Sequence, residues 1–453
     1  MKRIIITVKM LFCIGFILIL QACHQEFLAI KPTKSLVVPQ KLEDFQGLLD
    51  NMSTVMNRGV GMHVMAGDEM FVEPVNLLQY DQIDRETYLW KLPPYPDNSS
   101  YDWSDAYRGI FYANIVLEGT KKYGEGSLPW LELEAAAKFY RAWALYGLVE
   151  AFGDKYDAAK LKELKGVPVR LDPDIEVIAQ RASLFDTYKQ IFEDLDFAKS
   201  YLPEKIEYVT RPSKTAALAL LARIYLAIEE YDKALLNAEL SMKFKDDLLD
   251  YNTLNTSNTR TFPLGYLGTN PEVIFYSILT TGAYTILATT YCDTVLIEDF
   301  HNCDLRRTSF FKDLGNKRAN YKGSYTGSAT AFGGLATDEL YLIRAECLIR
   351  LDRSAEAKPY LDKLLINRWM KNSYVPILLE GQEELLRFVL QERRKQLYLR
   401  GLRWPDLKRL NKDPRFQVTL KKRGTDGQLL ELPPDDNRYV FPIPGNELEY
   451  ITK

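Results

Sequence analysis

The clearest hydrophobic pattern lies near the C-terminal end of the 453-residue chain. Apolar side chains recur there at the three- and four-residue spacing of a helix that buries one face: Leu386, Val389, Leu390 and Leu397. Gly401 then provides a residue that readily adopts the left-handed conformation at the end of a helix. Pro405 suits the first turn of a following helix, where its missing N–H is not needed. Residues 390–411 therefore predict a long helix, a glycine turn and a short helix.

Charged side chains are concentrated in the same stretch. Glu392, Arg393 and Arg394 are neighbours, and two interpretations of them are open. In the first, they join an ion-pair network inside the fold. In the second, they lie on a solvated face of the helix.

The helical period recurs near residues 102–154, 183–246 and 337–411. Each group contains a similar phrase: Arg-Ala-Trp-Ala-Leu from residue 141, Ala-Arg-Ile-Tyr from residue 222 and Arg-Ala-Glu-Cys-Leu from residue 344. Small alanine side chains in these phrases let paired helices approach closely. The spacing resembles the tetratricopeptide repeat without its usual Trp and Gly positions. We therefore predict a mostly α fold, built from degenerate tetratricopeptide-like helix pairs.

Two long stretches, 52–101 and 247–336, lose the helical period. Glycines and prolines punctuate the first stretch, which also concentrates aromatic residues. In the second, residues 273–292 carry no charge, but five threonines make them too polar for a confident membrane span. A strand and a Thr-rich loop are predicted there instead. We expect both stretches to be large irregular loop insertions with minor β structure.

The N-terminus has the pattern of an exported protein. Lys2, Arg3 and Lys9 precede an apolar run over residues 10–20. The run is too short to span a bilayer and fits a secretory signal. The sequence Leu-Gln-Ala-Cys ends at Cys23 and resembles a bacterial lipobox. We predict that residues 1–22 are a lipoprotein signal peptide and that Cys23 carries the lipid. The alternative is an ordinary signal peptide with a cysteine there by chance.

Composition excludes several function classes. The chain is 47% hydrophobic and 26% charged, with a formal net charge of −3, so no basic face for nucleic acid is expected. His24, His63 and His301 have no metal-ligand spacing, and the cysteines form no zinc-site pair. The sequence contains no phosphate-binding glycine loop and no nucleophile elbow. We therefore expect no metal, no cofactor and no readable catalytic group.

Several phrases point in chain order to one known family. They are Asn-Pro-Glu-Val-Ile-Phe at 270–275, Asp-Leu-Arg-Arg at 304–307, Glu-Arg-Arg-Lys at 392–395, Gly-Leu-Arg-Trp at 401–404, Asp-Leu-Lys-Arg at 406–409 and Arg-Tyr-Val-Phe-Pro-Ile-Pro at 438–444. Together with the lipobox, this order resembles the SusD/RagB family of surface lipoproteins. The resemblance covers nearly the whole chain and predicts one SusD-like domain over residues 23–453.

The resemblance implies a function. It predicts a lipid-anchored protein on the cell-surface side of the outer membrane, which binds a glycan without cleaving it. Its partner would be a SusC-like TonB-dependent transporter, which it covers as a lid and to which it delivers oligosaccharide or polysaccharide. Three alternatives remain. They are a RagB-like peptide-binding protein, a helical glycoside hydrolase with two carboxylates about 5–10 Å apart, and a protein-binding scaffold.

A glycan site needs flat aromatic rings for the apolar faces of sugars and polar groups for their hydroxyls. Both loop insertions contain this mixture. Trp90 is the first candidate for the platform, because it lies with other aromatics and an asparagine. The predicted ligand-binding residues are Asp68, Tyr88, Trp90, Tyr95, Asn98, Tyr266 and Tyr284. The remaining tryptophans fall in helical contexts and are predicted to be core residues: Trp103, Trp130, Trp143, Trp369 and Trp404.

The cysteines of the mature chain allow one disulfide. An exported protein can form disulfides, and Cys292 and Cys303 are close enough in sequence to pair. The alternative is two free thiols. Cys347 occupies a helical repeat position and is predicted to be a small buried hydrophobic residue.

Overall fold

The computed structural model describes residues 38–52, 54–97, 99–280 and 282–451. The chain divides into two units, residues 1–41 and residues 42–453. The predicted signal peptide and Cys23 lie outside the described residues. The account below therefore concerns residues 42–451.

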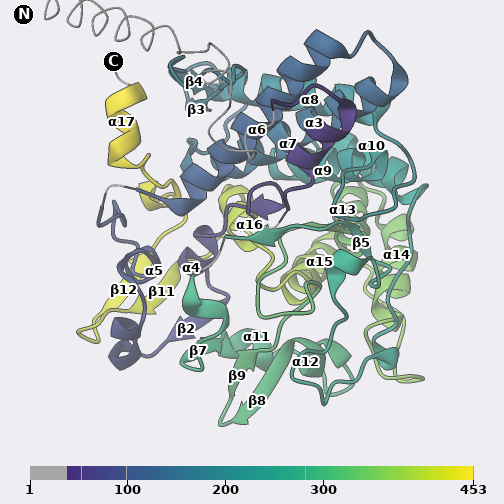
Figure 1. Ribbon diagram of the computed structural model, residues 1–453. Coiled ribbons are helices and arrows are strands. Elements are labelled where there is room, and N and C mark those ends of the chain that lie inside the picture. The colour runs from purple at the N-terminus through teal and green to yellow at the C-terminus, as the bar shows by residue number, and fades with distance from the viewer. Residues whose placement is uncertain (1–37, 53, 98, 281, 452–453) are drawn as a thin grey trace, which may run out of the picture. The chain divides into compact units, whose positions relative to one another are not determined.

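Paired helices form the framework of this unit (Figure 1). Their bounds are α3 Leu42–Leu49, α6 Tyr101–Tyr123, α7 Leu128–Phe152, α8 Leu184–Tyr201, α9 Lys214–Ala227, α10 Tyr231–Met242, α13 Thr337–Arg350, α14 Ser354–Ile366, α15 Gln382–Gln396 and α16 Arg403–Leu410. The predicted mostly α fold class is confirmed. The long helix, the glycine turn and the short helix predicted from residues 390–411 are α15, Gly401 at φ +74° and α16.

Sequence explains why the helices start where they do and pack so closely. Ser183 and Ser213 accept hydrogen bonds from the backbone N–H groups of Asp186 and Ala216, which satisfies donors that have no partner inside the first turn. Helix α7 is buried on nearly every side, because alanines such as Ala137 and Ala142 leave room for its neighbours. Together these helices form one hydrophobic core.

The two insertions contain short strands and single helical turns. In the first insertion these are β1 Arg58–Gly59, α4 His63–Ala66, β2 Met70–Val72, η1 Pro74–Gln79 and α5 Gln82–Tyr88. In the second they are η2 Tyr251–Thr253, η3 Gly265–Leu267, β5 Val273–Phe275, β6 Ile278–Leu279, η4 Ala283–Thr285, β7 Thr290–Cys292, α11 Thr294–Glu298, α12 Leu305–Phe310, β8 Phe311–Gly315, β9 Arg318–Tyr321 and β10 Leu335–Ala336. Residues 273–292 form strands and loop, as predicted. Within the described ranges, none of the helices is long and apolar enough to cross a membrane.

Strand pairing joins the two insertions. Strand β2 pairs antiparallel with β7, with Phe71 opposite Tyr291, and β1 pairs parallel with β6. The remaining two-stranded sheets are β5 with β10, β8 with β9, the pair β3 Lys165–Pro168 and β4 Arg181–Ser183, and the pair β11 Leu420–Arg423 and β12 Leu429–Leu432. In Figure 1, strands β2, β7, β8 and β9 lie together at the bottom, away from helices α6 to α10. The insertions therefore form a joint region at one side of the helices.

Ion pairs inside the fold connect the insertions to α15. Arg306 binds both Asp304 and Glu392, each at 2.6 Å, and its side chain is fully buried. Arg368 binds Glu272 at 2.7 Å, and both side chains are fully buried. The Glu-Arg-Arg-Lys phrase at 392–395 is thus part of a buried network and not a solvated face.

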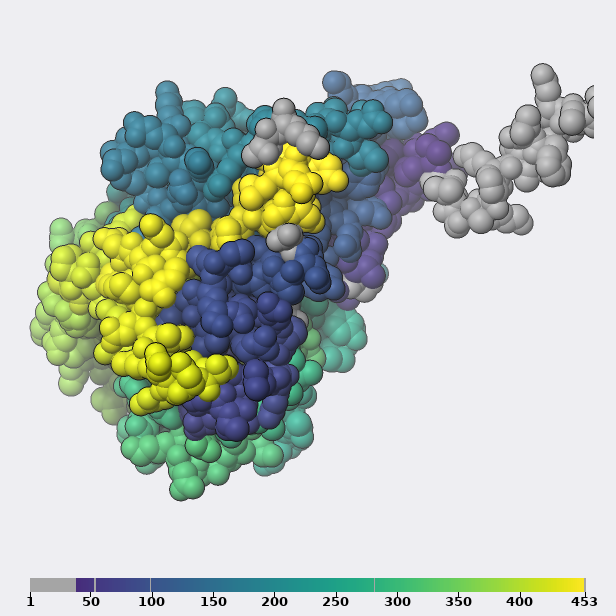
Figure 2. All heavy atoms as spheres, turned by 90° about the vertical axis from the view of Figure 1, so that its left-hand side faces the viewer, coloured from purple at the N-terminus to yellow at the C-terminus, as the bar shows by residue number. Residues whose placement is uncertain are grey.

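The C-terminal segment returns to the first insertion. After the β11–β12 hairpin come η5 Asn437–Tyr439 and α17 Gly445–Ile451. Figure 2 shows this yellow segment against the blue residues of the first insertion. Lys422 donates from Nζ to the carbonyl oxygens of Met65 and Ala66, at 2.7 and 3.1 Å. The hydroxyl of Tyr95 donates to the carbonyl of Pro442 at 3.0 Å.

The predicted disulfide is wrong, because Cys292 and Cys303 are free thiols. Cys292 is buried within β7, where it pairs opposite Met70. Cys303 lies in a turn whose N–H is bonded to Nδ1 of His301 and is only partly buried. The two backbones are thus held by separate partners. Cys347 is a fully buried residue of α13, as predicted.

Candidate ligand-binding site

Trp90 is not the exposed platform that its sequence context suggested. Its side chain is 4% exposed, and its indole Nε1 donates to the carbonyl of Ala66 at 2.9 Å. The ammonium group of Lys422 lies 4.8 Å from the centre of its ring. A ring enclosed in this way offers no face to a ligand. We therefore correct the prediction: Trp90 packs the first insertion against the β11–β12 hairpin.

Three predicted tyrosines are buried in the same way. Tyr88, Tyr95 and Tyr284 are at most 5% exposed. The hydroxyl of Tyr88 accepts the N–H of Val72 at 3.1 Å, and burial raises the pKa of Tyr88 to about 12. Tyr88 and Tyr95 stabilise the first insertion from within, so their predicted role in direct ligand contact is also corrected. Tyr284 is buried but lines a small hollow described below.

Asp68 is occupied by two arginines. Its oxygens accept from Nε and Nη2 of Arg403 at 2.7 and 2.8 Å, and Arg394 lies at 3.2 Å. Burial opposes ionisation, yet the two guanidinium groups hold the pKa of Asp68 well below its usual range. Asp68 therefore fixes the junction between the first insertion and α16, and it is not positioned to accept a sugar hydroxyl.

The last two predicted residues differ in outcome. Tyr266 lies in η3 and is 38% exposed, with its ring centre 6.0 Å from that of Tyr276. It is the one predicted aromatic residue with an accessible face. Asn98 lies outside the described residues.

The second insertion contains a hollow of about 510 Å³, which we call the insertion pocket. Its walls come from the loop before β5, from η4, α11 and α12, and from the β8–β9 hairpin. The lining residues are Thr256, Ser257, Asn258, Thr259, Arg260, Thr285, Ile286, Ile297, Arg307, Thr308, Phe311, Lys312, Asp313, Ala319, Asn320, Tyr321 and Lys322. All of them belong to the predicted insertion 247–336.

The lining combines neutral hydrogen-bonding groups with apolar surface. Seven of the lining residues carry an uncharged hydroxyl or amide: Thr256, Ser257, Asn258, Thr259, Thr285, Thr308 and Asn320. Tyr321 contributes a partly buried aromatic ring and Ile286 an exposed apolar side chain, whereas Phe311, only 4% exposed, packs within the wall. Hydroxyl and amide groups can exchange hydrogen bonds with an uncharged polar ligand, while the apolar side chains cover its apolar faces.

The charged residues of the insertion pocket are bonded mainly to the protein. Nζ of Lys322 donates to the carbonyls of Thr256 and Thr308, at 2.7 and 3.1 Å, and burial lowers the pKa of Lys322. Arg307 pairs with Asp313 at 3.3 Å. These three charged residues hold the walls together, and most of the remaining lining residues are neutral.

The first insertion adjoins this pocket through β7. The side chain of Gln79 accepts from Thr289 at 3.1 Å, and the hydroxyls of Tyr80 and Thr290 are hydrogen bonded. A smaller hollow of about 130 Å³ reaches from Met70 to Thr285 and shares part of its lining with the insertion pocket. The two insertions therefore meet beside the insertion pocket, and Tyr284 is the one described residue of the predicted set that lines the smaller hollow.

Sequence reasoning missed this lining because it looked for tryptophan. The signal that could have found it is the run Asn-Thr-Ser-Asn-Thr-Arg at 255–260, where hydroxyl and amide side chains follow one another. Within the described ranges, no group of three His, Cys, Asp or Glu side chains is placed to hold a metal ion.

Comparison with known proteins identifies the family. Residues 26–226 match a family described as starch-binding and associating with the outer membrane, and residues 317–450 match the SusD family. SusD-like protein P2 from Formosa agariphila is 25% identical over an alignment of 413 positions, which covers 76% of this chain and 77% of that protein.

Solved structures share the fold. A SusD superfamily protein from Bacteroides fragilis has a TM-score of 0.71 at 22% identity, over 92% of this chain and 99% of that one. A SusD-like carbohydrate-binding protein from Bacteroides vulgatus has a TM-score of 0.68 at 15% identity, over 91% and 97%. The family matches at both ends of the chain, joined by this shared fold, place the chain in the SusD/RagB family.

Proposed function

We propose that the protein captures a glycan in the insertion pocket. The observation that carries the proposal is the pocket lining, in which seven threonine, serine and asparagine residues adjoin the ring of Tyr321 and the exposed side chain of Ile286. Sugars present hydroxyls at their rims and C–H groups on their faces, and such a lining complements both. The description of the matching family as starch-binding supports the same ligand class.

Binding without cleavage fits this lining better than hydrolysis. Glycoside hydrolases use two carboxyl groups, one on each side of the scissile bond. Among the described lining residues, Asp313 is the one carboxylate, and it is already paired with Arg307. A protein-binding scaffold would not need the aromatic and hydroxyl groups, and a peptide ligand remains the outcome that the binding experiment must exclude.

The protein is further proposed to act at the cell surface. A lipid on Cys23 would anchor it to the outer membrane, and a SusC-like TonB-dependent transporter would receive the captured glycan. The lipobox sequence and the outer-membrane association of the matching family support this part. A lid that stays attached to its barrel needs a contact of well over about 1,000 Å². Extraction in mild detergent should recover the two proteins together, and a Cys23→Ser variant should be released from membranes.

A glycan array is the experiment that tests the binding function. The lipid-free protein, beginning after Cys23, is applied to immobilised oligosaccharides and polysaccharides, with immobilised peptides of similar length beside them. We expect binding to a narrow set of glycans and none to the peptides. Binding to the peptides alone, or to nothing on the array, contradicts the proposal.

A further inference from the structure

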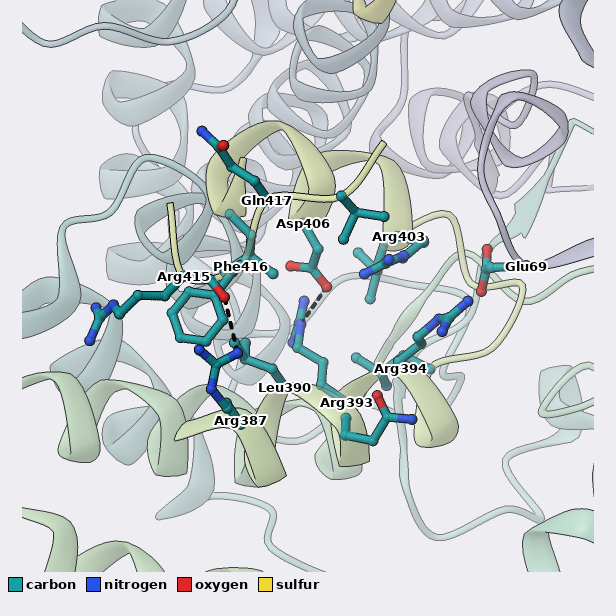
Figure 3. A pocket seen from close by; sticks show the side chains of 15 residues that line it. Glu69, Arg387, Leu390, Arg393, Arg394, Arg403, Asp406, Arg415, Phe416 and Gln417 are labelled. Carbon is teal, nitrogen blue, oxygen red and sulfur yellow. Dashed lines mark hydrogen bonds and ion pairs between the residues drawn. The ribbon is translucent and has the colours of Figure 1, made fainter. Parts of the chain in front are cut away.

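A second hollow, of about 360 Å³, lies between α15, α16 and the segment 415–418 (Figure 3). We call it the arginine cleft, because five of its lining residues are arginines: Arg387, Arg393, Arg394, Arg403 and Arg415. Leucines and the ring of Phe416 form the rest of its walls, together with Glu69 and Asp406. Guanidinium groups thus dominate its polar lining, whereas hydroxyl and amide groups dominate that of the insertion pocket.

Carboxylates hold these arginines in place. Arg393 donates to Asp406 at 2.8 Å across the cleft, as Figure 3 shows. Arg394 donates to Asp293 at 2.6 Å. Asp68, Glu383 and Asp413 bind the other three guanidinium groups at 2.7 Å. The local charge is therefore largely balanced, and a ligand would be held by directed hydrogen bonds more than by a positive field.

Two guanidinium donors at the cleft have no partner. Within the described part of the chain, Nη1 of Arg393 and Nε of Arg394 are buried and make no hydrogen bond. Arg393 is only 3% exposed. A buried donor without an acceptor destabilises the fold, and more so when it is charged. Such a group in a folded protein calls for an acceptor at that place.

The walls indicate what kind of molecule carries the acceptor. Phe416 presents a ring on the side of the cleft formed by residues 415–418, opposite α15 (Figure 3). Leu390 and Leu402 add apolar surface nearby. An acceptor group attached to a ring with C–H faces would contact arginine and phenylalanine at the same time.

The acidic neighbours limit the charge of the ligand. Asp406 and Glu69 line the cleft, and Asp68 is directly behind Arg403. A doubly charged phosphate would meet these carboxylates at close range, whereas a singly charged group meets less repulsion. Carboxylate and sulfate ester groups are singly charged, and both match the planar donors of arginine.

We propose that the arginine cleft is a second binding site, which takes the carboxylate or sulfate ester of an acidic sugar. This goes beyond the neutral insertion pocket and rests on the proposed glycan-binding function in one respect, namely that the anionic group is carried by a sugar. The guanidinium groups of Arg393 and Arg394 donate to the anion, and Phe416 lies against the sugar ring.

Isothermal titration with three matched probes tests this proposal. They are tetragalacturonate, its methyl ester, which is neutral and otherwise the same, and a sulfated tetrasaccharide. We expect tetragalacturonate or the sulfated probe to bind at least about tenfold more tightly than the methyl ester, since hydrogen bonds to charged groups contribute about 1.5–3 kcal/mol. The preferred anion identifies which of the two groups the cleft takes.

Two variants connect the preference to the cleft. Arg415→Gln removes a half-exposed guanidinium from its rim, and Arg393→Lys keeps a positive charge beside Asp406 while removing the Nη donors. Each should reduce the preference for the acidic probe several-fold. Arg353→Gln is the control, because Arg353 is equally exposed and also binds a carboxylate close to it in sequence, but lies outside the cleft. It should bind like the unchanged protein.

The possible results separate this proposal from the glycan-binding function. Equal affinity for tetragalacturonate, the sulfated probe and the methyl ester overturns the arginine cleft as an anion site and leaves the glycan-binding function standing. A second result has the same meaning. In it, Arg415→Gln and Arg393→Lys leave the preference for the acidic probe unchanged, and Thr308→Trp in the insertion pocket removes that preference. If Arg393→Lys does not fold, Arg415→Gln against Arg353→Gln decides alone. Failure of every glycan on the array contradicts both proposals.

Discussion

Two regions of the protein use polar groups in opposite ways. One is the interior that joins the helices to the insertions, and the other is the insertion pocket. In the interior, charged side chains are fully buried and paired, as Arg368 is with Glu272 and Arg306 with Glu392. In the insertion pocket, the groups that face the hollow are mainly neutral hydroxyls and amides. Buried charges need fixed partners, so they suit the joining of distant segments. Moving a neutral donor or acceptor out of water costs less free energy than moving a charged group, so neutral groups suit a ligand that must also be released.

Breaking a buried pair should give the largest effect. Arg368→Leu leaves Glu272 in the interior without its cation, and removing one partner of a buried pair costs about 3–5 kcal/mol. Urea denaturation should record this loss. Adding Glu272→Gln to the same chain removes the isolated charge, and part of the lost stability should return.

The exposed pair Arg353–Glu356 is the control for this comparison. Arg353→Leu should leave the free energy of unfolding nearly unchanged, because solvent screens an exposed pair. A similar loss in Arg353→Leu and Arg368→Leu would contradict the difference drawn between buried and exposed charge.

Trp90→Ala should have the next largest effect, and the effect should be on stability and not on ligand affinity. The substitution empties a buried site beside Ala66 and Lys422, and removal of a buried tryptophan side chain costs about 3–5 kcal/mol. The melting temperature should fall by several degrees. The fraction that remains folded should bind an array-selected glycan with unchanged affinity. Weaker binding at an unchanged melting temperature would restore Trp90 as a ligand platform.

Buried carboxyls of α5 and α6 give a smaller effect that depends on pH. Burial raises the pKa values of Asp84 and Asp102 to about 7. The native state therefore binds protons that the unfolded chain has already lost, and their contribution to stability falls as pH rises from about 4 to about 7. The Asn of Asp102→Asn can still accept from the N–H of Gly61. This variant should gain stability over the unchanged protein between pH 5 and pH 8, by about 1–3 kcal/mol.

The quantity to measure is the difference in stability between Asp102→Asn and the unchanged protein. His63 is present in both, and it changes stability with pH in the opposite direction to Asp102. Burial lowers the pKa of His63 to about 4, so its contribution to stability rises with pH up to about 6.5. Parallel stability curves for Asp102→Asn and the unchanged protein would show that Asp102 is ionised in the native state throughout this range.

Local patterns were sufficient to predict the helices. The apolar positions 386–397, Gly401 and Pro405 each act within one or two turns of chain, and the structure has the predicted helix, turn and helix there. The family phrases were also sufficient to predict the fold, because they contain residues that bind one another in the folded chain. Charges in several of them have their partners in another phrase, as Glu392 binds Arg306 and Arg393 binds Asp406.

The candidate site could not be predicted residue by residue, because burial in the insertions depends on distant contacts. Trp90 looks accessible in sequence and is covered by Lys422, more than three hundred residues later. Asp68 looks available and is held by Arg403. Threonines such as Thr256 and Thr308 are separated in sequence and meet only when β8, β9 and α12 fold against one another.

Tyr266→Ala should have the smallest effect. The ring lies outside the insertion pocket and is 38% exposed, so its removal should change the free energy of unfolding by about 0.5 kcal/mol or less. Glycan affinity should not change. A tenfold loss of affinity in titration would move the ligand site to η3 and remove the insertion pocket from the account.

The most direct test of the central claim uses a pair of matched substitutions in the second insertion. Thr308 lines the insertion pocket and Thr269 does not, while both are exposed and both donate from the side chain to a nearby backbone carbonyl at 3.2 Å. A tryptophan at position 308 fills part of the hollow, whereas one at position 269 projects elsewhere. Titration of an array-selected glycan should give at least about tenfold weaker binding for Thr308→Trp and unchanged binding for Thr269→Trp, since loss of a central contact commonly costs about 2 kcal/mol or more. Equal affinities in the two variants, with both folded, would contradict glycan binding in the insertion pocket.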